Sequence, residues 1–277
     1  ERAEDTCPLT VAIRNGVAAV SGGGVAVFRR ALNGDWIAEP SNASTGPGDV
    51  AVGTGVVLTS RPVCEGLGVN TFRPDQSGVW TEAFEITSNV GCDFWGLTGN
   101  DVDISAGNRL IASESSAWAT PAAHIFEPTA TSWTQVATLV SPLSSPFFGF
   151  RVAIDDTRAF ASGPLEAPIH VFNRAGSTWT HSVDVVPPDS AVRAQVGAIK
   201  VRDRLFVGFP YDPHRGGSVG VFSADASGQY EEVAKLVPRS VQPEFPYPPF
   251  GGDVDVSING SFTRVVASGQ DGVHVSI

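Results

Sequence analysis

The sequence predicts an all-β fold, a β-propeller of four-stranded antiparallel blades, and two observations predict it. The 277 residues include 30 Gly and 20 Pro, and with plentiful Val, Thr and aromatic residues this composition favours short strands joined by turns. A short phrase also recurs along the chain at intervals of about 40–50 residues, the period of a propeller blade. Together they favour a ring of similar sheets.

The recurring phrase ends an apolar run with Phe, continues through a small polar loop and reaches Trp or Tyr seven or eight residues after the Phe. The stretches VFNRAGSTWT (171–180) and IFEPTATSWT (125–134) are nearly identical. We predict that each phrase forms the hairpin between the third and fourth strands of a blade, and that its aromatic residues pack blades together. The phenylalanines of the phrase are Phe28, Phe72, Phe126, Phe172 and Phe222, and the aromatic residues that follow them are Trp36, Trp80, Trp133, Trp179 and Tyr230.

Two further apolar runs precede each phrase and supply the first and second strands. One sheet with two apolar faces cannot bury both alone, but stacking such sheets around an axis covers them and leaves only short edges. The expected first strands are 10–13, 49–52, 101–104, 151–154, 198–201 and 253–256, and the second strands lie within 17–23, 56–62, 109–115, 158–164, 204–210 and 264–270.

The sixth unit lacks a run for its fourth strand. We therefore expect residues 1–8 to add the missing outer strand and to close a six-bladed ring, with a seven-bladed ring lacking one unit as the alternative. One propeller domain would span 1–277, with units at approximately 9–46, 47–95, 96–147, 148–195, 196–249 and 250–277.

The net charge and the first residue indicate which partners the protein binds and in which compartment it works. Lys plus Arg is 18 and Asp plus Glu is 29, a net charge of −11, which repels phosphate backbones and argues against nucleic acid. No apolar run approaches the roughly 20 residues of a membrane span. The chain begins with Glu and has no Met, so it is a processed chain or a fragment, and a removed secretory signal is one explanation. We expect a secreted, extracellular or cell-surface protein.

Three cysteines allow at most one internal disulfide. Cys64 falls in the loop between the second and third strands of unit two, and Cys92 falls in the joint to unit three. Both connections emerge on one face of a propeller, so a Cys64–Cys92 disulfide is the first choice. Pairing of Cys7 with either stays open.

Two stretches carry a family resemblance. FGFRVAIDDTRAFASGP (148–164) and VGAIKVRDRLFVGFP (196–210), with joints such as PFGG (249–252), resemble FG-GAP repeats, the units of integrin-α-type propellers. The resemblance implies a cell-surface or secreted propeller that recognises proteins or sugars through loops on one face. The turns after the first strands are too short and too poor in carboxylates for the family's calcium loop, so we expect no metal and no cofactor.

The innermost strands carry charges that would border a central channel. Charges there need partners or water, so we expect a wet channel with ion pairs. A polar axial pocket for an ion or small ligand is an alternative. Hydrolysis by paired carboxylates would need a cleft and a raised pKa, for which the sequence offers no sign. The channel positions are Asp103, Arg151, Lys200 and Asp255, with Asp49, Asp101 and Asp253 at the strand starts.

The longest and least repetitive loops lie on the face that carries the cysteines. Exposed aromatic residues beside Asp and Arg suit sugar stacking or a protein hot spot. These residues are Trp118, Tyr211, Asp212, Arg215, Phe245 and Tyr247.

No nucleophile-elbow or metal-binding motif stands out. G-x-S-x-G is absent, and the five histidines lack metal-type spacing. His124, His170 and His274 occupy matching third-strand positions, and we expect them to pack as repeat positions. The sequence thus predicts a non-catalytic extracellular recognition module that binds protein or glycan, and not an enzyme. The alternatives are a carbohydrate-binding lectin and a hydrolase or lyase with a site at the central channel. The histidines are His124, His170, His181, His214 and His274.

Overall fold

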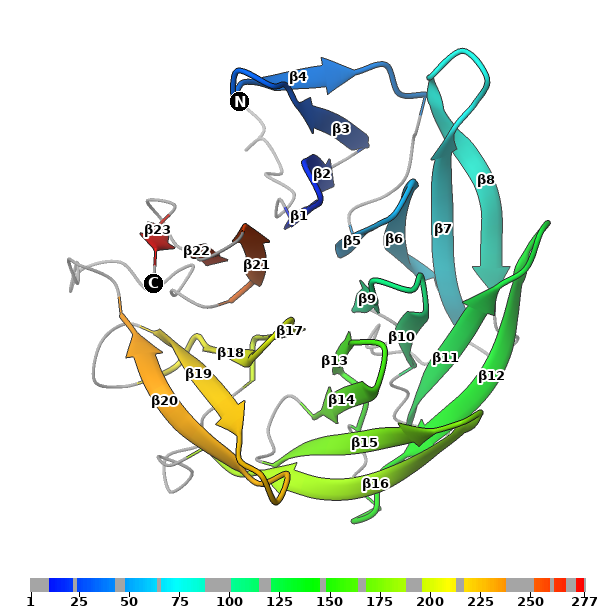
Figure 1. The fold of residues 1–277 in the computed structure, drawn as a ribbon. Coiled ribbons are helices and arrows are strands. Elements are labelled where there is room, and N and C mark those ends of the chain that lie inside the picture. Colours follow the sequence, from blue (N-terminus) through cyan, green and yellow to red (C-terminus); the bar gives the residue numbers. More distant parts are fainter. Residues whose placement is uncertain are drawn as a thin grey trace, which may run out of the picture.

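Every regular element among the described residues is a β-strand, and the strands form six antiparallel sheets arranged in a ring (Figure 1). The computed structural model describes residues 10–21, 24–42, 48–63, 66–87, 101–114, 121–144, 148–163, 168–187, 196–212, 217–237, 252–259, 262–267 and 273–276. No helix in these ranges is long and apolar enough to cross a membrane.

Five sheets have four strands and the sixth has three, always in chain order from the centre outward. Blade 1 comprises β1 (Thr10–Arg14), β2 (Val17–Ser21), β3 (Val25–Arg30) and β4 (Trp36–Glu39). Blade 2 comprises β5 (Val50–Gly53), β6 (Val56–Val63), β7 (Gly66–Pro74) and β8 (Trp80–Thr87). Blade 3 comprises β9 (Val102–Ile104), β10 (Leu110–Glu114), β11 (Ala122–Pro128) and β12 (Trp133–Val140).

The remaining sheets repeat this plan. Blade 4 comprises β13 (Arg151–Ile154), β14 (Arg158–Ser162), β15 (Ile169–Ala175) and β16 (Thr178–Val185). Blade 5 comprises β17 (Ala198–Val201), β18 (Leu205–Phe209), β19 (Ser218–Ala224) and β20 (Tyr230–Leu236). Sheet 6 comprises β21 (Val254–Asn259), β22 (Phe262–Ala267) and β23 (Val273–Ser276).

The recurring phrase forms the predicted hairpin between the third and fourth strands. In blade 4, Phe172 pairs with His181 across β15 and β16, and the register shifts between Val171 and Phe172. Blades 2, 3 and 5 carry a bulge at the corresponding Phe. A bulge sets two residues of one strand against one of its partner, so each fourth strand changes the face of its side chains at this point.

The tight turns between neighbouring strands follow from their local sequence. Asn15 and Gly16 join β1 to β2 with φ of 50° and 74°, the left-handed backbone that an Asn-Gly hairpin turn requires. Asp75 precedes β8, and its Oδ1 accepts the backbone N–H groups of Ser77 and Val79 at 2.8 and 3.0 Å. Asp225 binds Ser227 and Gln229 in the same way before β20. These turns hold the hairpins in register.

Five apolar clusters fill the five interfaces between consecutive sheets. Between blades 1 and 2, Phe72 and Trp80 pack against Val17 and Val27 and are 0% and 1% exposed. Each phrase therefore faces the preceding blade, and full burial of such a side chain contributes about 1.5–3 kcal/mol.

The innermost strands form a continuous ring. Each contacts the next, and β21 of sheet 6 contacts β1 of blade 1. Trp36 is 43% exposed, because the face of blade 1 that carries it points toward sheet 6, which has three strands among the described residues. Residues 1–9 lie outside the described ranges, so the predicted closing strand there stays a prediction.

Candidate functional site

The charged residues at the centre lie on one side of the innermost strands. Side chains alternate along a strand, so Val102 and Ile104 of β9 enter the apolar cluster between blades 2 and 3. Asp101 and Asp103 point the other way, toward blade 4 and the channel, and are 5% and 2% exposed. The alternation thus separates the apolar core from a polar axis.

The channel aspartates accept hydrogen bonds from the inner edge of the following blade. Asp101 Oδ2 accepts the Val152 N–H at 2.7 Å, and Asp103 Oδ2 accepts the Ile154 N–H at 3.0 Å. The Asp255 carboxylate accepts the Ile13 N–H in the same way between sheet 6 and blade 1. An inner strand has unpaired backbone donors on its channel side, so these carboxylates satisfy them and link the blades.

Buried cations balance part of this negative charge. Lys200 Nζ lies 3.7 Å from Asp103 Oδ1 across the channel, and both side chains are nearly inaccessible. Arg202 lies 3.5 Å from Asp255. Burial by itself lowers the pKa of Lys200, but attraction to the surrounding aspartates outweighs it and raises the pKa above its ordinary value. The ammonium group therefore stays charged.

Asp101 and Asp49 form a carboxyl pair at one end of the channel. Burial of Asp101, its hydrogen bond to Asp49 and the repulsion between the two carboxylates raise the pKa of Asp101 well above its usual range, while Lys200 and Arg151 oppose the shift. Two carboxyl groups in contact cannot both ionise easily. The pair therefore keeps a proton at pH values at which an ordinary aspartate has lost it.

Asp253 titrates close to neutral pH. Burial in the protein and repulsion from Asp49 and Asp255 raise its pKa to about 6, against the attraction of Lys200 and the Val254 N–H. A carboxylate with such a pKa can accept a proton as a general base. The channel end thus combines a proton donor, a proton acceptor and a permanent cation.

These three carboxylates occupy the same repeat position, immediately before the first residue of an innermost strand. Asp49, Asp101 and Asp253 each precede a Val, and Arg151 takes the position in blade 4. The repeated Asp-Val at the strand starts was therefore a usable signal for a carboxylate ring. The raised pKa values depend on contacts between blades that the sequence does not display.

The structure describes two of the six residues predicted for the loop face. Tyr211 is 48% exposed. Asp212 is buried, and its Oδ2 lies 2.7 Å from Ser218 Oγ and 3.1 Å from Lys235 Nζ, so it ties its loop to β19 and β20. The other residues predicted for this face or for the disulfide lie outside the described ranges: Trp118, Arg215, Phe245, Tyr247, Cys7, Cys64 and Cys92.

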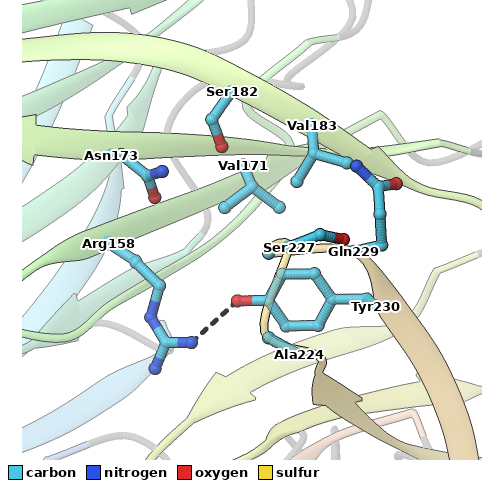
Figure 2. Close-up of a pocket in the computed structure, with 10 residues that line it drawn as sticks. Arg158, Val171, Asn173, Ser182, Val183, Ala224, Ser227, Gln229 and Tyr230 are labelled. Atoms are coloured by element: carbon cyan, nitrogen blue, oxygen red, sulfur yellow. Dashed lines mark hydrogen bonds between the residues drawn. The ribbon is translucent and has the colours of Figure 1, made fainter.

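A pocket of about 250 Å³ lies between blade 4 and the β19–β20 hairpin (Figure 2). Arg158 donates a hydrogen bond to the Tyr230 hydroxyl at 2.8 Å on one side of it, and Asn173 and Ser182 line the other. Its lining includes no carboxylate and no imidazole. The pocket therefore lacks a general base, and the channel is the better candidate for chemistry.

Comparison with known proteins finds relatives in structure only. No family model matches the chain, and no curated protein matches it. A provisional 6-phosphogluconolactonase of Bacteroides fragilis superposes with a TM-score of 0.63 and 14% identity, over 100% of this chain and 85% of that chain. The periplasmic gluconolactonase PpgL of Pseudomonas aeruginosa gives 0.60 and 15%, with the same coverage. A provisional 6-phosphogluconolactonase of Bacteroides uniformis gives 0.64 and 12%, over 97% and 82%.

These matches overturn the FG-GAP resemblance. The FG-GAP family model does not match, and the similar folds are seven-bladed lactonase propellers. Phe148 is fully buried between blades 3 and 4, and Gly149 has φ of 79° with the Ala122 carbonyl 2.6 Å from where a Cβ would lie. The Phe-Gly joint thus meets a packing need and is not a family signature.

The expectation of a non-catalytic recognition module was also wrong. Three proteins whose folds superpose on this chain are named lactonases, so the assignment as a non-enzyme no longer stands. At 12–15% identity the likeness shows the propeller fold alone.

Proposed function

We propose that this protein is a lactonase-type hydrolase whose site is the carboxylate end of the central channel. The observation that carries the proposal is the grouping of Asp101, Asp49 and Asp253, with raised pKa values at Asp101 and Asp253, beside Lys200 and Arg151. Similar propellers named gluconolactonases support the choice of a cyclic ester as substrate.

Each group has a role in opening a lactone ring. Ionised Asp253 takes a proton from water as the water oxygen bonds to the carbonyl carbon. Positive charge on Arg151 and Lys200 favours the oxyanion that forms. The carbon–oxygen bond of the ring then breaks, and the leaving alkoxide takes the proton held by the Asp101–Asp49 pair. The product is a hydroxy acid.

The test is the rate of hydrolysis of glucono-1,5-lactone and its 6-phosphate, measured by pH-stat above the spontaneous rate. Asp253→Asn and Asp101→Asn should lower kcat by about 10²–10⁴, the usual contribution of a general base or acid. Asparagine keeps an acceptor for the Val152 N–H, so the fold should persist. Tyr230→Phe, in the pocket between blades 4 and 5, is the control. Full activity in Asp253→Asn would overturn the assignment.

The geometry also supports a proposal about blade number. We infer that the six sheets form one ring in a single domain, with residues 1–8 as the fourth strand of sheet 6. The contact of β21 with β1 and the Asp255 bond to Ile13 support it. This chain also covers 85% of a seven-bladed neighbour, close to six blades in seven.

Deletion of residues 1–8 tests the closure. The shortened chain should melt at a lower temperature. An unchanged Tm would assign the closing strand elsewhere. Secretion and the Cys64–Cys92 disulfide stay predictions.

A further inference from the structure

We propose that His170, His181 and Asp184 form a binding site for a divalent transition metal of the zinc type on the outer part of blade 4. His170 Nδ1 and His181 Nε2 each lie 2.7 Å from the same atom, Asp184 Oδ1. One ligand atom from each residue lies within 4.8 Å of the others. The site is distinct from the channel and from the pocket beside Tyr230.

The bulge of the blade brings the three side chains to one face. Asp184 pairs with His170 across β15 and β16, and His181 pairs with Phe172, two residues along the same face. In a regular strand, residues three apart point to opposite faces, so His181 and Asp184 could not converge. The register shift at Phe172 removes that obstacle.

The other blades show that this constellation is not a packing requirement. In blade 3 the same register places Gln135 and Thr138 beside His124, and Gln135 Nε2 lies 3.0 Å from His124 Nδ1. Blade 5 has Gly220, Glu232 and Lys235 at these positions, and blade 2 has Asn70, Glu82 and Glu85. Among these four blades, two imidazoles and a carboxylate meet only in blade 4.

The donor set matches the chemistry of late first-row divalent metals. Two imidazole nitrogens and one carboxylate oxygen, with a position left for water, are typical of zinc and non-haem iron sites. Asp184 Oδ1 lies 2.7 Å from a ring nitrogen of each histidine, so the three donor atoms already converge on one point. A metal would replace the two N–H···O bonds, and the imidazole protons would move to the opposite ring nitrogens.

Packing holds the rings while leaving an entry. The His170 side chain is 2% exposed and lies 5.6 Å from the Phe148 ring, and the His181 ring lies 5.6 Å from Phe172. His181 and Asp184 are 32% and 31% exposed, so the site opens at its outer edge. One fixed ligand and two accessible ligands suit a metal that arrives from solvent.

The test is titration of the untagged, EDTA-treated protein with ZnCl₂ by calorimetry, together with the visible absorption of the Co²⁺ form. Wild type should bind one equivalent tightly and melt at a higher temperature with zinc. His181→Gln and Asp184→Thr, the residues of blade 3, should each weaken this binding at least tenfold and abolish the Tm rise. Blade 3 shows that the fold accepts both residues.

His124→Gln is the matched control, because it removes a histidine at the same repeat position, and it should leave zinc affinity unchanged. Absence of binding by wild type would overturn the proposal. So would undiminished affinity in both blade 4 variants, which would place the metal at another site such as the cysteines.

Discussion

The junction between blades 1 and 2 and the junction between sheet 6 and blade 1 use the same repeated phrase with different results. Phe72 and Trp80 are 0% and 1% exposed at the first junction. At the second, Phe28 is half-buried and Trp36 is 43% exposed. The difference teaches that burial of the phrase depends on the preceding sheet, which has four strands in blade 1 and three among the described residues of sheet 6.

The inner ends of the junctions differ much less. Asp101 bonds to the Val152 N–H between blades 3 and 4, and Asp255 bonds to the Ile13 N–H between sheet 6 and blade 1. Polar links at the axis thus recur at both kinds of junction, while apolar packing at the rim depends on the neighbour. Substitutions at equivalent repeat positions of the two junctions therefore measure how much the neighbouring sheet contributes to stability.

Replacing the phenylalanine of the repeated phrase by alanine should give the largest difference in stability between the two junctions. Phe72→Ala removes a fully buried ring and should cost about 3–5 kcal/mol of unfolding free energy. Phe28→Ala removes a half-buried ring and should cost roughly 1 kcal/mol. Urea denaturation of both variants measures the two costs. Equal losses would mean that the two junctions are packed alike.

The polar link at the closing junction should have an intermediate effect. Asp255→Ala leaves the Ile13 N–H without its acceptor and Arg202 without its ion-pair partner, and should cost about 1–3 kcal/mol. Asp255→Asn keeps an acceptor and should cost less. The ratio of the two losses, again from urea denaturation, separates backbone linkage from charge. A larger loss in the asparagine variant would contradict the role given to the N–H bond.

The pH dependence of stability should reveal the raised pKa of a channel carboxylate. The pKa of Asp253 is raised to about 6 in the folded chain, above the ordinary aspartate value of 3.8. The folded state therefore holds a proton that the unfolded state has lost, and this contribution to stability is present below about pH 4 and lost as pH rises through 6. Asp253→Asn should flatten the Tm profile between pH 4 and 7. An unchanged profile would show that Asp253 titrates normally.

The smallest effect should be spectroscopic. Trp36 should be quenched by acrylamide much more readily than the buried Trp80. Comparing Trp36→Phe with Trp80→Phe by Stern–Volmer analysis isolates each contribution. The Trp36 variant should lose the more accessible fraction, and the opposite order would contradict the exposure of Trp36 in the fold.

Several features followed from local sequence alone. The spacing from Phe172 to Trp179 predicted a hairpin, and β15 and β16 form it. The Asp-Val strand starts predicted charges at the axis, where Asp101 lies. These inferences succeeded because strand alternation and turn chemistry act over a few residues. The FG-GAP resemblance failed for a related reason, since Phe148 and Gly149 satisfy a local packing need between blades 3 and 4.

The sequence by itself determined the repeated unit, its four-strand order and the acidic character of the inner strands. Only the tertiary structure decided which of these residues could act. The pKa of Asp101 is raised because the fold buries its carboxyl group and because Asp49 reaches it from the neighbouring blade. His181 meets Asp184 and His170 because a bulge rotates one strand. Burial and charge repulsion at the channel arise between blades, from residues about 50 or more positions apart in the chain. A local sequence pattern cannot predict which of these residues come into contact.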